Sequence, residues 1–291
     1  MEIIQSTSDG EDESDLEKLE IQFLLEGIYR ISGYDFRNYI FSSIRRRIWY
    51  RVQAERLTTI SGLQEKIFHD PACMNRLLTD FSIQVTEMFR DPKFFISFRK
   101  NVVPWLRELP FIRIWHAGCS SGEEVYSMAI LLLEEGLYDK TRLYATDLNE
   151  NALEKAKEGI VPLEKMKTYT NNYLRAGGTQ SFSKYYKVIG DTVLFDKPLQ
   201  KNMVFNQHNL VTESSFNEFN VIFCRNVLIY FNRDLQNKVH RLFFDSLESS
   251  GFLVIGEKES IDFTVYKDKY EELDSEEKIY RKLNRGASNE R

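Results

Sequence analysis

The sequence predicts an α/β protein with a mostly parallel, doubly wound sheet, preceded by an all-helical domain. Two observations predict this fold. From residue 16 to about residue 95, apolar residues recur at spacings of three and four, which is typical of amphipathic helices. From residue 112 onward, short runs rich in β-branched residues alternate with helical stretches, the pattern of parallel strands joined by crossover helices. The 291 residues suffice for both parts.

The N-terminal part contains four predicted helices. The first begins at Leu16 and ends before Gly33, since glycine commonly follows the last residue of a helix. The second spans about 38–56, and two shorter ones follow at about 60–68 and 71–81. Because no alternating strand pattern interrupts them, we expect residues 16–95 to form one helical domain with its linker.

The net charge of −5 is distributed unevenly along the chain. Residues 1–15 hold six acidic side chains and no basic one, so we expect a disordered acidic tail there. Residues 17–95 hold twelve basic and ten acidic side chains. The predicted sheet domain follows at residues 96–284, and a short tail at 285–291 ends the chain.

Signs of secretion, membrane insertion and metal binding are missing from the sequence. Cys73, Cys119 and Cys224 lie far apart and form no CxxC pair, so we expect neither a disulfide framework nor a metal site. No apolar run approaches the roughly 20 residues of a membrane span, and the N-terminus is acidic rather than basic. We therefore expect a cytoplasmic monomer without a signal peptide and without membrane insertion.

Seven strands are predicted for the sheet. The strand–helix alternation supplies strands at 112–116, 142–146, 203–207, 220–223 and 251–255, and helices that end near 135 and span 149–159 and 233–247. Two closing segments, 263–266 and 278–283, are expected to pair antiparallel at the sheet edge. Residues 160–202 do not follow the alternation, and segments 185–188 and 192–195 predict a hairpin in a small β insertion.

The segment from Trp115 to Glu124 joins the first strand to the helix after it. Its Gly118 and Gly122 bracket a tight turn, which lets the backbone approach a ligand closely. Glycine could also serve the turn alone, so the type of ligand has to be argued from the neighbouring residues.

Three functional interpretations of this turn compete. A dinucleotide site would place a pyrophosphate at the helix N-terminus, where Glu123 and Glu124 would repel it. A hydrolase nucleophile elbow would match GxSxG at 118–122, but it needs an acid and then a histidine downstream. Only His208 and His240 follow, His240 falls within a predicted helix, and the elbow would come after the first strand instead of after several. A cationic adenosyl ligand, S-adenosylmethionine, suits the carboxylates, because Asp147 at the end of the next strand can hydrogen-bond ribose hydroxyls. Asp147 could instead cap the following helix.

Five sequence motifs, in this order along the chain, carry a resemblance to a known family. They are TEMFRD at 86–91, WHAGCSSGEE at 115–124 followed by Tyr126-Ser127, ATDL at 145–148, Asn209-Leu210, and FCRNVLIYF at 223–231. Together they resemble the chemotaxis-receptor glutamate O-methyltransferases of the CheR type. These enzymes methylate glutamates of methyl-accepting receptors with S-adenosyl-L-methionine and release S-adenosyl-L-homocysteine.

The resemblance implies a class I S-adenosylmethionine-dependent methyltransferase fold and a set of site residues. The cofactor pocket would contain Gln84, Thr86, Arg90, Ala117, Gly118, Glu123, Asp147, Asn209, Leu210, Arg225 and Asn226. Arg90, Arg225 and Tyr230 would act in catalysis. Gln84 stands where the family commonly has Asn, and His116 where it has Ser, so a contact from Gln84 would reach one methylene further.

The implied reaction needs alignment more than acid–base chemistry. A glutamate carboxylate, with a pKa near ~4.3, is already an anionic nucleophile at neutral pH, so no general base is required. Arg90 and Arg225 are suited to hold carboxylates by charge-assisted hydrogen bonds. One would bind the cofactor carboxylate or shape the pocket, and the other, with Tyr230, would position the glutamate; which does which stays open.

Four arginines, Arg45, Arg46, Arg47 and Arg51, fall in the second predicted helix. The resemblance implies that this basic face meets the acidic helices of a chemoreceptor, although a plain solvated face is the alternative. Nucleic acid is disfavoured because the domain carries so little net positive charge. Two other functions stay open for the whole chain: a non-catalytic module that senses the cofactor, and a methyltransferase of this fold with a different acceptor.

Overall fold

The computed structural model describes residues 9–82 and 85–284, and these form two compact units. The helical unit comprises the described residues up to 82 together with a later segment, Tyr230–Leu235. The catalytic unit comprises the described residues on either side of that segment, from 85 to Ile229 and from Gln236 to 284. In the described part of the chain, no helix combines the length and apolarity that a membrane crossing requires.

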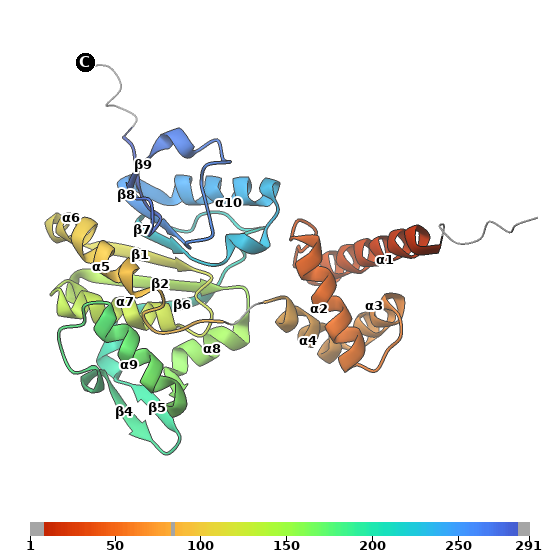
Figure 1. Ribbon diagram of the computed structural model, residues 1–291, viewed down its shortest axis with the longest axis horizontal. Coiled ribbons are helices and arrows are strands. Elements are labelled where there is room, and N and C mark those ends of the chain that lie inside the picture. Colours follow the sequence, from red (N-terminus) through yellow and green to blue (C-terminus); the bar gives the residue numbers. More distant parts are fainter. Residues whose placement is uncertain (1–8, 83–84, 285–291) are drawn as a thin grey trace, which may run out of the picture. The chain divides into compact units, whose positions relative to one another are not determined.

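The helical unit is built from α1 (Asp9–Ser32), α2 (Phe41–Ala54), α3 (Ile60–His69) and α4 (Pro71–Phe81) (Figure 1). The four predicted helices are therefore present. Side chains cap two of these helices: Thr59 caps α3, and the Asp70 carboxylate accepts the backbone N–H of Ala72 at 2.9 Å at the start of α4. The core consists of one apolar stripe from each helix, including Ile21, Leu24, Ile28, Ile44, Ile48, Val52, Leu63, Ile67 and Leu77.

The start of α1 corrects one prediction. The helix begins at Asp9, so residues 9–15, which we expected to lie in a disordered acidic tail, belong to a helix. Acidic residues are favourable in the first turns of a helix because its N-terminus carries a partial positive charge. Residues 1–8 and 285–291, the rest of the two predicted tails, lie outside the described residues.

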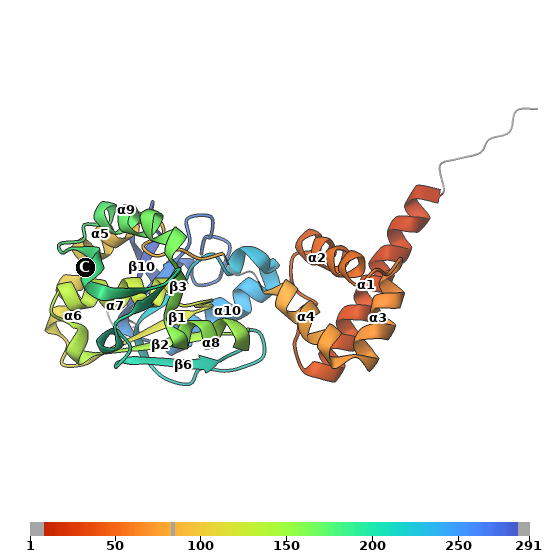
Figure 2. The same cartoon turned by 90° about the horizontal axis from the view of Figure 1, so that it is seen from below.

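The catalytic unit contains the predicted seven-stranded sheet, in the order β6-β2-β1-β7-β8-β10-β9 (Figures 1 and 2). Its strands are β1 (Ile112–Ala117), β2 (Thr141–Asp147), β6 (Met203–Gln207), β7 (Phe219–Cys224), β8 (Leu247–Ile255), β9 (Tyr270–Asp274) and β10 (Ile279–Lys282). The first five run parallel, and the last two pair antiparallel. The helices are α5 (Pro92–Asn101), α6 (Val103–Glu108), α7 (Glu123–Glu134), α8 (Glu150–Glu158) and α10 (Arg233–Ser246), whose first three residues fall in the helical unit.

The strand order locates a ligand site. From β1 the chain moves outward through β2 to β6, and then returns to the other side of β1 with β7. The order therefore reverses between β1 and β7, and ligands of open α/β sheets bind outside the carboxyl ends of the strands at such a reversal.

The closing hairpin differs from its prediction. β10 lies where a strand was expected, but its partner is β9, not residues 263–266. Phe263 and Val265 lie in an irregular segment and are largely exposed. β9 was missed because it is the edge strand and its sequence, YEELD, is mostly acidic, which is a common protection of sheet edges.

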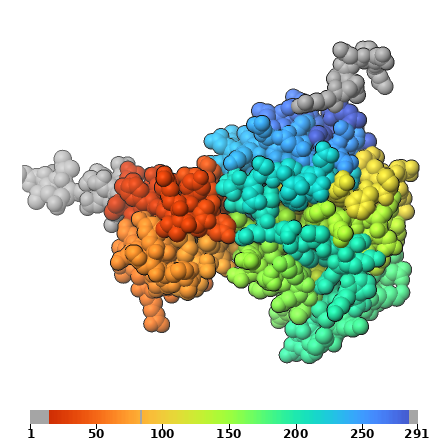
Figure 3. All heavy atoms as spheres, turned by 180° about the vertical axis from the view of Figure 1, so that it is seen from behind, coloured from red at the N-terminus to blue at the C-terminus, as the bar shows by residue number. Residues whose placement is uncertain are grey.

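The insertion between β2 and β6 contains more than the predicted hairpin. A small antiparallel sheet, in the order β3-β5-β4, joins β3 (Ile160–Pro162), β5 (Thr192–Phe195) and β4 (Tyr186–Ile189). It protrudes from the body of the catalytic unit, in green to turquoise (Figure 3). The insertion also contains a helix, α9 (Met166–Arg175), which the sequence pattern did not predict. One reason is that polar Asn172 occupies a position on its buried face.

Candidate active site

The carboxyl ends of β1, β2 and β7 form the floor of the site. Ala117 ends β1, and the chain then enters the glycine-rich turn, in which Gly118 has φ = +80° and Gly122 has φ = +91°. A Cβ on Gly118 would lie 2.5 Å from Cγ2 of Val227, and one on Gly122 would lie 2.9 Å from Cβ of Ala156. Both positions therefore require glycine, for conformation and for space.

Asp147, at the end of β2, holds the glycine-rich turn. Its Oδ2 accepts the backbone N–H of Ser120 at 2.7 Å, and its Oδ1 accepts the backbone N–H of Asn149 at 2.9 Å. Burial raises the pKa of Asp147, while these N–H donors act to lower it. Each carboxylate oxygen keeps a lone pair for a further donor, and the Oγ of Ser120 is buried without a partner among the described residues. This cradle fits the hydroxyl groups of an adenosyl ribose.

Glu123 opens α7 and lies inside the unit, with 3% of the residue exposed. The Ser121 hydroxyl donates to its Oε2 at 2.7 Å, and the Tyr169 hydroxyl lies 3.4 Å from its Oε1. Burial raises the pKa of this carboxyl. The predicted cofactor residue Glu123 is thus at the turn, with its carboxylate held by two hydroxyl groups.

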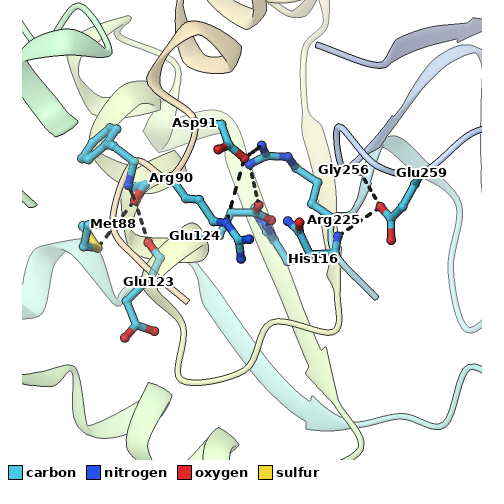
Figure 4. A network of polar contacts seen from close by, with 12 residues as sticks. Met88, Arg90, Asp91, His116, Glu123, Glu124, Arg225, Gly256 and Glu259 are labelled. Carbon is cyan, nitrogen blue, oxygen red and sulfur yellow. Dashed lines mark hydrogen bonds and ion pairs between the residues drawn. The ribbon is translucent and has the colours of Figure 1, made fainter. Parts of the chain in front are cut away.

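Four ionisable side chains of the site, Asp91, Arg225, Glu124 and His116, contact one another in this order (Figure 4). The Arg225 guanidinium, at the end of β7, donates to Asp91 Oδ2 at 2.8 Å and to Glu124 Oε2 at 3.2 Å. His116 Nδ1 lies 3.0 Å from Glu124 Oε1. Burial acts to raise the pKa of Glu124, but the His116 hydrogen bond and the Arg225 charge lower it overall.

Both terminal nitrogens of Arg225 bind carboxylates of the protein, whereas its Nε is buried without a hydrogen-bond partner among the described residues. Its side chain is only 4% exposed, and its guanidinium lies 4.3 Å from the ring centroid of Phe94. Arg225 therefore packs on an aromatic ring and holds the carboxylates of Asp91 and Glu124 in position. The sequence marked Arg225 but not its partners, which come from elements more than 100 residues away in sequence.

Arg90 differs from Arg225 in its surroundings. Its neighbours Phe89 and Asp91 both have left-handed backbone conformations, with φ of 49° and 56°. Its guanidinium donates to the Val85 carbonyl at 3.2 Å and lies 4.0 Å from Asp91 Oδ2, and its side chain is 37% exposed. Thr86, also predicted to contact the cofactor, is partly exposed nearby in sequence, whereas Gln84 lies outside the described residues.

The remaining predicted cofactor residues follow β6 and β7. Asn209 and Leu210 are buried after β6, and Asn209 Oδ1 accepts the Val211 N–H at 2.9 Å. Asn226 follows Arg225 with φ = +62°. Its N–H donates to Glu259 Oε2 at 3.0 Å, part of a set of backbone N–H groups around that buried carboxylate (Figure 4).

Glu259 is a buried carboxylate beside Asn226 that sequence reasoning missed. It is 5% exposed and accepts N–H groups from Asn226, Val227, Ile229 and Gly256. Burial raises its pKa. No motif drew attention to it, because a glutamate four residues after a predicted strand gives no spacing signal of its own.

Tyr230 is described within the helical unit. Its carbonyl accepts the Ile40 N–H at 2.8 Å, and the Arg47 guanidinium lies 5.4 Å from its ring centroid. The next residue, Phe231, forms a β-bridge with Tyr39.

Two of the four arginines that were predicted to form a basic face do not lie on the surface. Arg47 and Arg51 are buried, because they share the inward stripe of α2 with Ile44, Ile48 and Val52. Arg51 pairs with Asp80 at 2.7 Å and Glu55 at 3.2 Å. Arg46 is exposed, and Arg45 is half exposed and pairs with Glu17 at 2.8 Å. The exposed basic residues of the four are therefore Arg45 and Arg46.

Both units of the chain are similar to known proteins. The chain matches the family description "CheR methyltransferase, SAM binding domain" over residues 84–279 and "CheR methyltransferase, all-alpha domain" over residues 19–82. A Pseudomonas putida protein named "Putative methyltransferase Cher3" is 48% identical over 264 residues, which is 91% of this chain and 97% of that protein.

Two further relatives carry the name "Chemotaxis protein methyltransferase". The one from Vibrio anguillarum is 31% identical over 273 residues, or 89% of this chain and 93% of that protein. The one from Listeria innocua is 29% identical over 249 residues, or 85% of this chain and 92% of that protein.

The reversal of strand order at β1 and the acidic cradle around the glycine-rich turn define a class I S-adenosylmethionine-dependent methyltransferase. Both of its units match one family. The chain belongs to the CheR methyltransferase family, as the sequence motifs predicted.

Proposed function

We propose that this protein transfers the methyl group of S-adenosyl-L-methionine to the γ-carboxylate of glutamates in chemotaxis receptors, forming glutamyl methyl esters. Relatives named as chemotaxis methyltransferases cover both units and support this acceptor. The observation that carries the proposal is the contrast between two arginines. Arg225 is occupied by carboxylates of the protein itself, whereas Arg90 keeps an exposed guanidinium for a carboxylate from outside.

The residues of the site suit an in-line methyl transfer. When bound, S-adenosylmethionine supplies an electrophilic methyl group on a sulfonium. Asp147, Glu123 and Asn209 would hold this cofactor at the glycine-rich turn. The four carboxylates at the turn and the loop, Asp91, Glu123, Glu124 and Asp147, outnumber the guanidinium groups of Arg90 and Arg225, which favours a cation.

Arg90 positions the acceptor carboxylate in this scheme. The carboxylate is already charged, so the protein contributes alignment and exclusion of water, which can lower a barrier by roughly 7–11 kcal/mol. A partly exposed arginine forms a weaker ion pair than a buried one, so it can position the carboxylate without weakening it as a nucleophile. Tyr230 is the proposed second donor to this carboxylate, on the resemblance of its motif alone.

We further propose that Arg45 and Arg46 meet acidic helices of the receptor. They are the exposed members of the arginine cluster, and the buried pair of Arg51 with Asp80 is excluded from this surface. Long exposed basic side chains steer an acidic partner chiefly through the rate of association.

The test measures the transfer of tritiated methyl groups from the cofactor to cytoplasmic receptor fragments. The labelled fragments are then treated with alkali. We expect label that alkali releases as methanol, which marks a carboxyl ester. Label that resists alkali would point to another acceptor group. Binding of S-adenosylhomocysteine without any labelling would favour the non-catalytic, cofactor-sensing alternative.

Arg90→Ala gives the site-specific test of the same proposal. We expect it to lose methyl transfer by about 100-fold and to keep its affinity for S-adenosylhomocysteine, because the arginine acts on the acceptor. Arg107→Ala is the matched control, because Arg107 lies on α6, which precedes the amino end of β1, whereas the site lies at the carboxyl ends of the strands. Equal activity of Arg90→Ala and the control would contradict the assignment.

A further inference from the structure

Helix α9 of the insertion touches the active-site motifs along one face. Its residues Tyr169, Asn172 and Tyr173 are buried and stand three and four positions apart, so they share that face. The Tyr169 hydroxyl lies 3.4 Å from Glu123 Oε1, at the glycine-rich turn. The Tyr173 ring packs edge-on against Phe89, with centroids 5.3 Å apart.

Asn172 holds the backbone of the segment that carries Arg90. Its Nδ2 donates to the Met88 carbonyl at 3.1 Å and lies 3.4 Å from Glu87 Oε2. The residue is 8% exposed. Both hydrogen bonds of this buried amide go to residues 87 and 88. They hold the loop in position, because moving it away would leave a buried donor without a partner, which is energetically costly.

The loop needs such support because its backbone is strained. Phe89 and Asp91, on either side of Arg90, both adopt left-handed conformations that residues with side chains rarely occupy. Three elements hold it in place. Ser127 Oγ of α7 accepts the Phe89 N–H at 2.8 Å, Arg225 binds Asp91 at 2.8 Å, and Asn172 of α9 binds Met88.

We propose that Asn172 is a positioning residue for Arg90, so that the insertion takes part in methyl transfer through α9. Figure 2 shows α9 beside α5, the helix that begins directly after this loop. The role of Arg90 itself rests on the proposed function, whereas the hold of Asn172 on the loop does not.

The experiment compares Asn172→Asp with Asn171→Asp. Asn171 is the exposed neighbour on the same helix, so both variants add one negative charge and only the first touches the loop. At Asn172 the new carboxylate faces the Met88 carbonyl and the Glu87 carboxylate, which repel it.

Two readouts separate positioning from a general effect on folding. In amide hydrogen exchange of the folded protein, we expect residues 86–91 to exchange about tenfold faster in Asn172→Asp alone, with the sheet unchanged. In the receptor-fragment assay, we expect kcat to fall about 10- to 100-fold, with KM for the cofactor and the affinity for S-adenosylhomocysteine retained.

Unchanged exchange of residues 86–91 in Asn172→Asp would overturn the inference, whatever the acceptor is. A uniform rise in exchange over the whole catalytic unit would also overturn it, because it would show a structural role only. Faster local exchange with unchanged kcat would refute the link to Arg90. If the wild-type protein labels no receptor fragment, the proposed function fails, and the exchange readout alone decides the inference.

Discussion

His240 on α10 makes the stability of the catalytic unit depend on pH. The side chain is fully buried, and neither ring nitrogen has a hydrogen-bond partner among the described residues. Burial lowers the pKa of His240 from 6.5 to about 4. Because the charged imidazolium is disfavoured inside the unit, His240 binds its proton much more readily in the unfolded chain.

The sign and size of the effect follow from these two values. As pH falls below 6.5, the unfolded chain takes up a proton that the folded protein does not, so the free energy of unfolding decreases. Between pH 7 and pH 5 the loss amounts to about 2 kcal/mol. Below pH 4 the folded protein binds the proton too, and the loss levels off at about 3 kcal/mol.

The assay is urea unfolding at pH 7 and at pH 5, comparing wild type, His240→Leu and His69→Leu. Leucine has a similar volume and no nitrogen to protonate. Between pH 7 and pH 5 we therefore expect the free energy of unfolding to decrease by about 2 kcal/mol less in His240→Leu than in wild type. His69 is exposed on α3 of the helical unit, so its replacement should leave the wild-type dependence intact. Identical pH dependence of wild type and His240→Leu would refute the reasoning.

Two further predictions concern ligand and partner binding. Asp147→Ala removes the acceptor that holds Ser120 and Asn149, so we expect S-adenosylhomocysteine to bind at least about tenfold more weakly in calorimetry; unchanged affinity would take Asp147 out of the site. Arg46→Glu should slow methylation of receptor fragments at low salt several-fold, with less effect at high salt, whereas Lys155→Glu, an exposed control on α8, should not. Equal rates for the two variants would argue against docking through α2.

Most of the fold could be predicted because its helices, strands and turns follow from patterns of residues that are close together in the sequence. The alternation of strands and helices from β1 to β8 and the positive-φ glycines leave direct marks in the sequence. The fold class, the cofactor and the family were confirmed on this basis. The errors fell where the sequence departs from the usual pattern of a helix or strand: α9 has a polar residue on its buried face, and β9 is an acidic edge strand.

The site was less predictable because its contacts are tertiary. The two buried arginines of α2 show this well: a cluster of basic residues suggests a surface, yet helical periodicity turns Arg47 and Arg51 inward. Likewise, Arg225 pairs with Asp91 and Glu124, and nothing in the motif around Arg225 indicates these two partners. The motifs therefore predict the residue types of the site, but they do not predict which arginine is paired with carboxylates of the protein and which is exposed.

The short segment Tyr230–Leu235 has a consequence for protein engineering. The family is described as two separate modules, with a border between residues 82 and 84, but in this chain the helical unit includes six residues from far beyond that border. A fragment ending at residue 82 would lack the β-bridge partner of Tyr39, and a fragment beginning at 84 would expose the buried Phe231. A chimera that exchanges the helical module should therefore also exchange residues 230–235, so that the cut is made in three places instead of one.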